Sequence, residues 1–315
     1  MSEASASRPI VECVPNVSEG RDPEVIEAIR VAAASVPDVA LLDVDSDEWH
    51  NRTVYTFVGP AEEVGEAAFR LVREAAGRID LRRHRGQHPR IGAADVVPFV
   101  PLTGLDLGGL AAGSLQACKA LAGRVGQRIA GELGIPVFLY GEAARRPERA
   151  VPAPFRKGGF EALRESIGRD PVRLPDFGSG RVHPSAGATA VGARTLLVAY
   201  NVFLDTDDVE VASAIARAIR ESSGGLPRVQ ALGFLVRGRA QVSTNLLDVD
   251  ATPPAAVWSA VREEAVRLGT RALRGEIVGL APERCLPEEG APLGLEIDPR
   301  SRALEPRIRE VLRAD

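Results

Sequence analysis

The second half of the chain predicts strands and helices in an order that few folds accommodate. Its predicted strands are residues 195–203, 229–236, 241–247 and 276–280, and its predicted helices are 207–221 and 252–268. Arg237-Gly238-Arg239 marks the turn between the two middle strands. The order strand, helix, strand, strand, helix, strand is typical of a ferredoxin-like unit.

The first half follows the same order with additional elements. Its predicted strands are residues 10–14, 39–44, 52–58, 96–100 and 136–140, and its predicted helices are 22–35, 61–77 and 106–133. Asp22-Pro23 is a typical helix start, since aspartate caps the first turn and proline suits its first position. Residues 141–187 show little periodicity. We therefore predict an α/β (α+β) fold of two ferredoxin-like α/β subdomains, 1–183 and 184–315, with a ligand groove between them.

Composition narrows the functional classes. The 315 residues carry a formal net charge of −4, and because a nucleic-acid-binding domain is usually strongly basic, no nucleic-acid partner is expected. The cysteines, Cys13, Cys118 and Cys285, are far apart without a CxxC pair, which disfavours a disulfide framework or a zinc site.

There is no secretory signal pattern and no apolar run of the roughly 18 residues that span a bilayer. A cytoplasmic chain without membrane contact is expected.

A basic segment at residues 81–90, LRRHRGQHPR, is the most unusual local feature. It holds four arginines, two of the four histidines and no acid. On a helix, His84 and His88 could share a metal ion, but Gly86 and Pro89 disfavour a helix and no third ligand is near. An imidazole titrates near neutral pH and suits acid/base catalysis. A basic surface loop with incidental histidines is the alternative.

The arginines of this segment offer guanidinium forks that match carboxylate groups. Pairing with surface acids is the expected use of Arg82 and Arg83, whereas Arg90 is a better candidate for binding a ligand carboxylate. Four such cations near one imidazole would also lower its pKa.

Two other stretches offer weaker site candidates. The acidic stretch 43–48 runs from the end of a predicted strand into a predicted loop at 45–51. It lacks the ligand spacing and the central glycine of an EF-hand calcium loop. Asp45 is instead a candidate partner for a cationic or amino group. The segment 178–187, GSGRVHPSAG, departs from the GxGxxG pattern at His183, and no helix clearly follows. Its small residues still permit a flat ligand to approach the backbone closely.

Six blocks of sequence, taken in order and spacing, resemble the formiminotransferase domain family. They are VECVPNVSEGRDPEVIEAI, LLDVDSDEWHNRTVYTFVGP, HRGQHPRIGAADVVPFVP, PVFLYGEAA, PDFGSG…GATAVGAR and QVSTNLLD. The resemblance implies transfer of a formimidoyl group from N-formimidoyl-L-glutamate to tetrahydrofolate, a co-substrate, in histidine degradation. It also implies two α/β subdomains with a folate site between them, a homodimer and no metal. Some members carry a C-terminal cyclodeaminase domain, which this chain is expected to lack.

The resemblance also implies roles for individual residues. The family's Gly-Glu-His-Pro-Arg motif corresponds to Gly86-Gln87-His88-Pro89-Arg90, so the catalytic histidine would be His88 rather than His84. Arg90 and Asp45 would contact substrate. The folate-contacting residues would be Gly178, Ser179, Gly180, Arg181, Val182, His183, Pro184, Ser185, Ala186 and Gly187.

Two departures from the family pattern leave alternatives open. Gln87 replaces a glutamate that could orient the histidine, and Ala186 stands where the family commonly has tryptophan. A related transferase that moves a formyl group, or uses another amino acid, is therefore an alternative to the formimidoyltransferase. A non-catalytic folate-binding protein is a third reading, which the presence of His88 disfavours.

Overall fold

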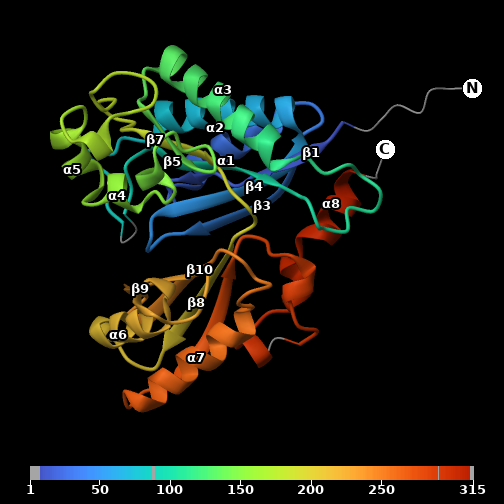
Figure 1. Cartoon of the computed structure of the whole chain (residues 1–315), viewed down its shortest axis with the longest axis vertical. Helices are drawn as coiled ribbons and strands as arrows, with labels where there is room; N and C mark the ends of the chain where they lie inside the picture. The colour runs from blue at the N-terminus through green and yellow to red at the C-terminus, as the bar shows by residue number, and fades with distance from the viewer. Residues whose placement is uncertain (1–7, 87–88, 290, 313–315) are drawn as a thin grey trace, which may run out of the picture. The chain divides into compact units, whose positions relative to one another are not determined.

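The structure, a computed structural model, describes residues 8–86, 89–289 and 291–312, which form two compact units (Figure 1). Of the described residues, those up to Arg194 together with Val311 and Leu312 form the first unit, and those from Thr195 to Glu310 form the second. The predicted division after residue 183 remains a proposal. Strand β7 (Thr189–Ala193) follows residue 183 in the chain, yet it pairs with strands of the first unit.

The first unit contains a ferredoxin-like core, as predicted. Its elements are β1 (Ile10–Cys13), β2 (Asn16–Val17), α1 (Pro23–Ala34), β3 (Ala40–Asp47), β4 (Arg52–Pro60), α2 (Ala61–Arg78), β5 (Ala94–Pro101), α3 (Leu115–Leu133), β6 (Val137–Gly141), α4 (Ala153–Arg156), α5 (Gly159–Ser166) and β7. Strands β3, β4, β1 and β5 are antiparallel neighbours in that order. Strands β7 and β6 extend the sheet in parallel beyond β5.

Helices α1, α2 and α3 cover one face of this sheet (Figure 1). Alternation along β4 turns Tyr55 and Phe57 towards these helices, where they are fully buried with Phe69 of α2. Helix α1 begins as predicted, because the Asp22 carboxylate accepts hydrogen bonds from the backbone N–H groups of Glu24 and Val25.

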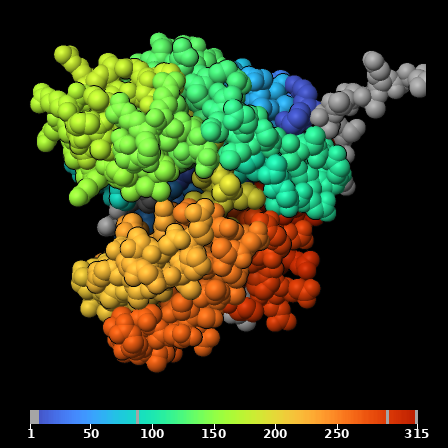
Figure 2. Space-filling model, in the orientation of Figure 1, coloured from blue at the N-terminus to red at the C-terminus, as the bar shows by residue number. Residues whose placement is uncertain are grey.

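Short helices in residues 141–187 pack at the β6 and β7 end of the sheet, on the other face. Phe155 of α4 stacks on Phe138 of β6, with ring centroids 4.9 Å apart and planes 8° apart. Leu163 of α5 joins the same apolar cluster. In Figure 2 these helices form part of the yellow-green end of the first unit. The sequence of residues 141–187 shows little periodicity because α4 and α5 are too short to display a helical period.

The second unit confirms the predicted ferredoxin-like order. Its elements are β8 (Val198–Leu204), α6 (Val209–Ile219), β9 (Val229–Val236), β10 (Arg239–Leu246), α7 (Pro254–Arg267), β11 (Ala272–Val278) and α8 (Leu304–Leu312) except for its last two residues. The sheet order is β11-β8-β10-β9, with antiparallel neighbours throughout. The predicted turn at residues 237–239 is a two-residue turn, because Arg239 already lies in β10, and both Arg237 and Gly238 have positive φ, of 52° and 70°.

Other parts of the prediction differ from the structure. Residues 106–114 are not helical, because α3 begins only after its N-cap at Ser114. Asp45 and Asp47 lie in β3 rather than in a loop, paired with Val54 and Arg52 of β4. Strand β7 was not predicted. Among the helices of the described residues, none is long and apolar enough to cross a membrane.

Candidate active site

Backbone hydrogen bonds bring the two segments singled out in the sequence together. The Leu81 N–H donates to the Ser185 carbonyl, at 2.9 Å, where the basic segment begins. At its other end, the Ala93 N–H donates to the Ala186 carbonyl and the Ala188 N–H to the Ile91 carbonyl, both at 2.9 Å. Residues 183–187 are thus joined to both ends of the segment that contains His88.

The 183–187 segment is itself a tight turn. His183 and Gly187 exchange backbone hydrogen bonds of 2.8 and 3.0 Å, and His183 Nδ1 accepts a third from the Ala186 N–H at 3.0 Å. Gly187 has a φ of +74°, and a Cβ there would lie 2.1 Å from the Ile91 carbonyl oxygen. Only glycine fits this position. Ala186 is 1% exposed and belongs to the apolar core.

The remaining part of the predicted folate segment lies against other elements. Gly178 approaches Pro136 at the start of β6, and Gly180 approaches Gly168 beyond α5. Gly180 and Arg181 also line an open hollow together with Arg164 and Arg169. Among the described residues, the backbone hydrogen bonds that join 178–187 to the basic segment and the residues just after it come from Ser185 and Ala186.

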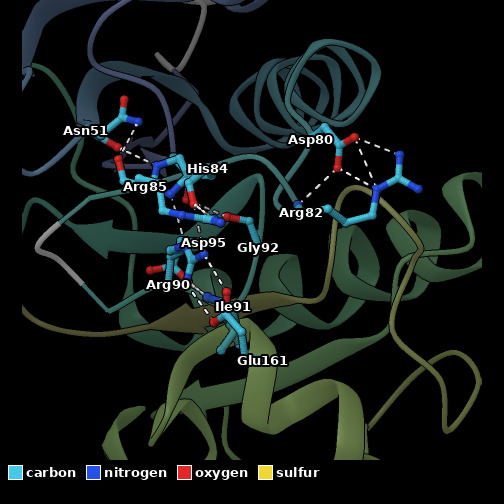
Figure 3. A network of polar contacts seen from close by, with 11 residues as sticks. Asn51, Asp80, Arg82, His84, Arg85, Arg90, Ile91, Gly92, Asp95 and Glu161 are labelled. Carbon is cyan, nitrogen blue, oxygen red and sulfur yellow. Dashed lines mark hydrogen bonds and ion pairs between the residues drawn. The ribbon is translucent and has the colours of Figure 1, made fainter.

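His84 is held by hydrogen bonds at both ring nitrogens (Figure 3). Arg90 Nε, which can only donate, lies 3.0 Å from His84 Nδ1, so this nitrogen accepts. The other nitrogen, Nε2, must then carry the proton, which it donates to the Asn51 carbonyl at 3.0 Å. Burial lowers the pKa of His84, whose residue is 7% exposed. These contacts fix a neutral imidazole with no free nitrogen, a geometry that suits positioning rather than proton transfer.

Arg90 connects His84 to helix α5. Its two terminal nitrogens donate to the carboxylate of Glu161 at 2.9 and 3.0 Å, in a bidentate pair visible in Figure 3. The Arg90 side chain is only 14% exposed, whereas that of Glu161 is 55% exposed. The Arg90 guanidinium beside Glu161 lowers the pKa of that carboxyl. The carboxylate that Arg90 binds in the structure is thus one of the chain's own.

A small pocket lies beside this network. It is lined by Val17, Ser18, His50, Asn51, Arg52, His84, Arg90 and Asp95. Burial lowers the pKa of Arg52 to about 10, an effect that the Asp95 charge opposes and the Arg156 charge reinforces. Arg156 forms an ion pair with Asp95. The pocket wall therefore combines the cations Arg52 and Arg90 with the Asp95 carboxylate and with hydrogen-bonding groups.

The other predicted site residues occupy varied positions. Gln87 and His88 lie outside the described residues. Asp45 lies on β3, in the same hairpin as Asn51, whose side chain donates to the Arg85 carbonyl at 3.0 Å. Arg82 pairs with Asp80 at 2.7 Å, as expected for a surface arginine. Within the part of the chain that the structure describes, no group of three or more His, Cys, Asp or Glu side chains is placed to hold a metal ion.

Sequence reasoning missed the residues that hold the basic segment in place. Asn51 comes from a hairpin tip, Asp95 from β5, and Arg156 and Glu161 from α4 and α5. Asn51, Arg156 and Glu161 are between 33 and 71 positions away from the residues of the segment that they contact, whereas Asp95 is only four positions from Ile91. No local pattern identifies such partners, because only the fold brings them together.

We expect acidification to destabilise the protein partly through His84. The folded pKa of His84 is lowered, so the unfolded chain binds the proton more tightly and the free energy of unfolding falls as pH drops below about 6.5. Above that pH the contribution is fully present. His84→Gln keeps an acceptor and a donor but does not titrate, so it should flatten this slope. Urea unfolding of both proteins between pH 7.5 and 5 measures the difference, and parallel slopes would contradict the assignment.

Known proteins resemble this chain over most of its length. Residues 10–194 match the formiminotransferase domain, N-terminal subdomain, and residues 199–291 match the formiminotransferase domain. A glutamate formimidoyltransferase of Streptococcus pyogenes serotype M1 is 44% identical over 88% of this chain and 90% of its own length. One from Thermoplasma acidophilum is 46% identical over 88% of this chain and 89% of its own.

A longer relative matches through only part of its length. The formimidoyltransferase-cyclodeaminase of Rattus norvegicus is 43% identical over 90% of this chain, which spans 52% of that protein. The two family matches fall in both compact units, and the alignments with the two glutamate formimidoyltransferases each cover 88% of this chain. The chain belongs to the formiminotransferase domain family.

Proposed function

We propose that this chain is a glutamate formimidoyltransferase, which moves a formimidoyl group from N-formimidoyl-L-glutamate to tetrahydrofolate. The observation that carries the proposal is the identity of 44% and 46% to two glutamate formimidoyltransferases that the chain matches over about nine-tenths of their length. The products are 5-formimidoyltetrahydrofolate and glutamate, as expected in histidine degradation.

In the proposed reaction, His88 is the general acid and base. N5 of tetrahydrofolate attacks the formimidoyl carbon, forming a C–N bond and a tetrahedral intermediate, while His88 takes the N5 proton. His88 then returns this proton to the glutamate nitrogen as its bond to carbon breaks. One imidazole can perform both transfers because its pKa lies near neutral pH. The fixed, neutral state of His84 supports this choice between the two histidines.

The substrate contacts are proposed for Arg90, Asp45 and residues 178–187. Since Glu161 already occupies the Arg90 guanidinium, a substrate carboxylate would bind there by replacing Glu161. The exposure of Glu161 supports such an exchange. The 183–187 turn would place the folate beside the basic segment, to which it is hydrogen-bonded.

A paired assay tests the function. The protein is incubated with tetrahydrofolate and either N-formimidoyl-L-glutamate or N-formyl-L-glutamate, and the folate product is followed spectrally. We expect turnover with the formimidoyl donor. Turnover only with the formyl donor would favour the related formyltransferase, for which Gln87 in place of the family glutamate is the motivating observation. Tight folate binding without turnover of either donor would indicate a non-catalytic folate-binding protein.

Further properties follow from the family and are proposed with it. We expect a cytoplasmic homodimer that uses tetrahydrofolate as co-substrate and needs no metal, and we expect it to bind neither nucleic acid nor membrane. Light scattering after size exclusion tests the homodimer, and activity after treatment with a chelator tests the metal.

A further inference from the structure

The peptide groups that directly follow His88 are each fixed by a partner from elsewhere in the fold. Arg156 Nη2 donates to the Pro89 carbonyl at 2.8 Å, and the Phe160 N–H donates to the Arg90 carbonyl at 2.8 Å. The Ile91 N–H donates to Asp95 Oδ1 at 2.8 Å. Arg156 is central to this arrangement, because the same Nη2 also donates to Asp95 Oδ2. One ion pair therefore holds the backbone on both sides of Arg90.

The position of Arg156 is in turn set by rigid packing. Its neighbour Phe155 is fully buried and stacks on Phe138 of β6, which ties α4 to the sheet. Gly159 has a φ of +68°, and a Cβ there would meet the Arg90 carbonyl oxygen at 3.2 Å. The start of α5 can thus reach Arg90 only because this residue is glycine. The sheet, through α4 and α5, determines where Pro89 and Arg90 lie.

Stability alone does not account for this ion pair. Asp95 is 3% exposed, and desolvating two charges offsets much of what their attraction contributes. Among the described residues, Arg156 Nε has no hydrogen-bond partner. Arg156 also lies close enough to the buried Arg52 for its charge to lower the pKa of that residue. These are unfavourable contributions, whereas the hydrogen bond to Pro89 acts on the residue next to the proposed catalytic histidine.

We propose that Arg156, paired with Asp95, is a positioning residue for the transfer reaction. It acts through the Pro89 carbonyl to preorganise the backbone that carries His88. This inference rests on the proposed function of His88, and it assigns Arg156 no contact with substrate. Misplacing a catalytic group by about 1 Å can cost roughly 100-fold in rate, so a residue of this kind affects kcat more than KM.

Arg156→Met is the first variant of the test. We expect kcat to fall by roughly 10- to 100-fold, because the backbone next to His88 loses a hydrogen-bond donor. Both KM values should stay within about three-fold of wild type. Arg128→Met is the matched control, because Arg128 is an ion-paired arginine on α3 of the same unit, away from residues 89–91. Its kcat should equal that of wild type.

The double variant Asp95→Asn with Arg156→Met separates positioning from folding. Arg156→Met alone deprives the buried Asp95 carboxylate of its ion-pair partner and leaves Arg52 as a nearby cation, which lowers stability. The additional Asp95→Asn removes the carboxylate charge and keeps an acceptor for the Ile91 N–H, so part of the lost free energy of unfolding should return. If Arg156 positions His88, kcat stays low. Recovery of kcat together with stability, or an effect confined to KM, would overturn the proposal.

A readout that needs no turnover separates this inference from the proposed function. Proton NMR of the four histidine rings identifies His88 by the signal that His88→Ala removes. We expect Arg156→Met to shift or broaden that signal and Arg128→Met to leave it in place. Absence of turnover in wild type would reject the proposed function, whereas an unmoved His88 signal in Arg156→Met would reject the positioning role regardless of activity.

Discussion

Replacing His88 with alanine is expected to lower kcat for formimidoyl transfer by roughly 10²- to 10⁴-fold, the usual contribution of a general acid or base. The loss should be large because one imidazole would serve both proton transfers, so alanine removes the base of the first step and the acid of the second. Steady-state kinetics with N-formimidoyl-L-glutamate and tetrahydrofolate measures the change. KM for folate should move far less than kcat, since His88 is not assigned to binding.

His84→Gln is the matched control for this experiment. Glutamine can accept from Arg90 Nε and donate to the Asn51 carbonyl, so it preserves the two contacts of His84 without an imidazole. We expect a much smaller loss of kcat than in His88→Ala. Normal transfer by His88→Ala together with loss in His84→Gln would reverse the assignment and identify His84 as the catalytic group.

The parts of the fold that local chemistry specifies were predictable from the sequence. Asp22-Pro23 predicts the start of α1, and Arg237-Gly238 predicts the hairpin between β9 and β10, because each depends on the residues at that position. The strand and helix order of the second unit also follows from local periodicity. Strand β7 carries no such pattern. It is a short Ala- and Gly-containing strand, fully buried between the parallel strands β5 and β6, so it shows no alternation of apolar and polar residues.

For the candidate site, too, the sequence predicts some features, whereas others depend on the fold. The basic segment and 178–187 stand out by composition, but their association depends on hydrogen bonds between residues about a hundred positions apart. Arg90 was predicted as a carboxylate ligand from the shape of its guanidinium, and the structure supplies a carboxylate from Glu161. Sequence indicates what a side chain can bind, whereas its actual partner is set by the packing of distant elements. The same holds for Arg156, because the sequence around it does not indicate its contact with the Pro89 carbonyl.

Replacing Arg149 with leucine is expected to lower the free energy of unfolding of the first unit by about 3–5 kcal/mol, as for other buried ion pairs that lose one partner. Its side chain is fully buried and donates to Asp176 at 2.5 Å and to the Val172 carbonyl at 3.2 Å. The Asp176 side chain is 4% exposed, so leucine would leave a desolvated carboxylate with the Leu139 N–H as its remaining donor in the structure. Urea unfolding followed by fluorescence measures the loss. Trp49 reports on the first unit when Trp258 is replaced by phenylalanine.

Two further variants determine whether the buried charge is the cause. Arg124→Leu removes the exposed ion pair with Glu62 in the same unit and should cost only about 0–1 kcal/mol, since solvent screens such pairs. Asp176→Asn combined with Arg149→Leu removes the orphaned carboxylate and keeps an acceptor for the Leu139 N–H, so at least half of the lost stability should return. A double variant no more stable than Arg149→Leu would show that the loss comes from packing against Phe138, over whose ring the guanidinium lies at 5.2 Å. Recovery would instead establish that burial of Asp176 is tolerated only because Arg149 neutralises it.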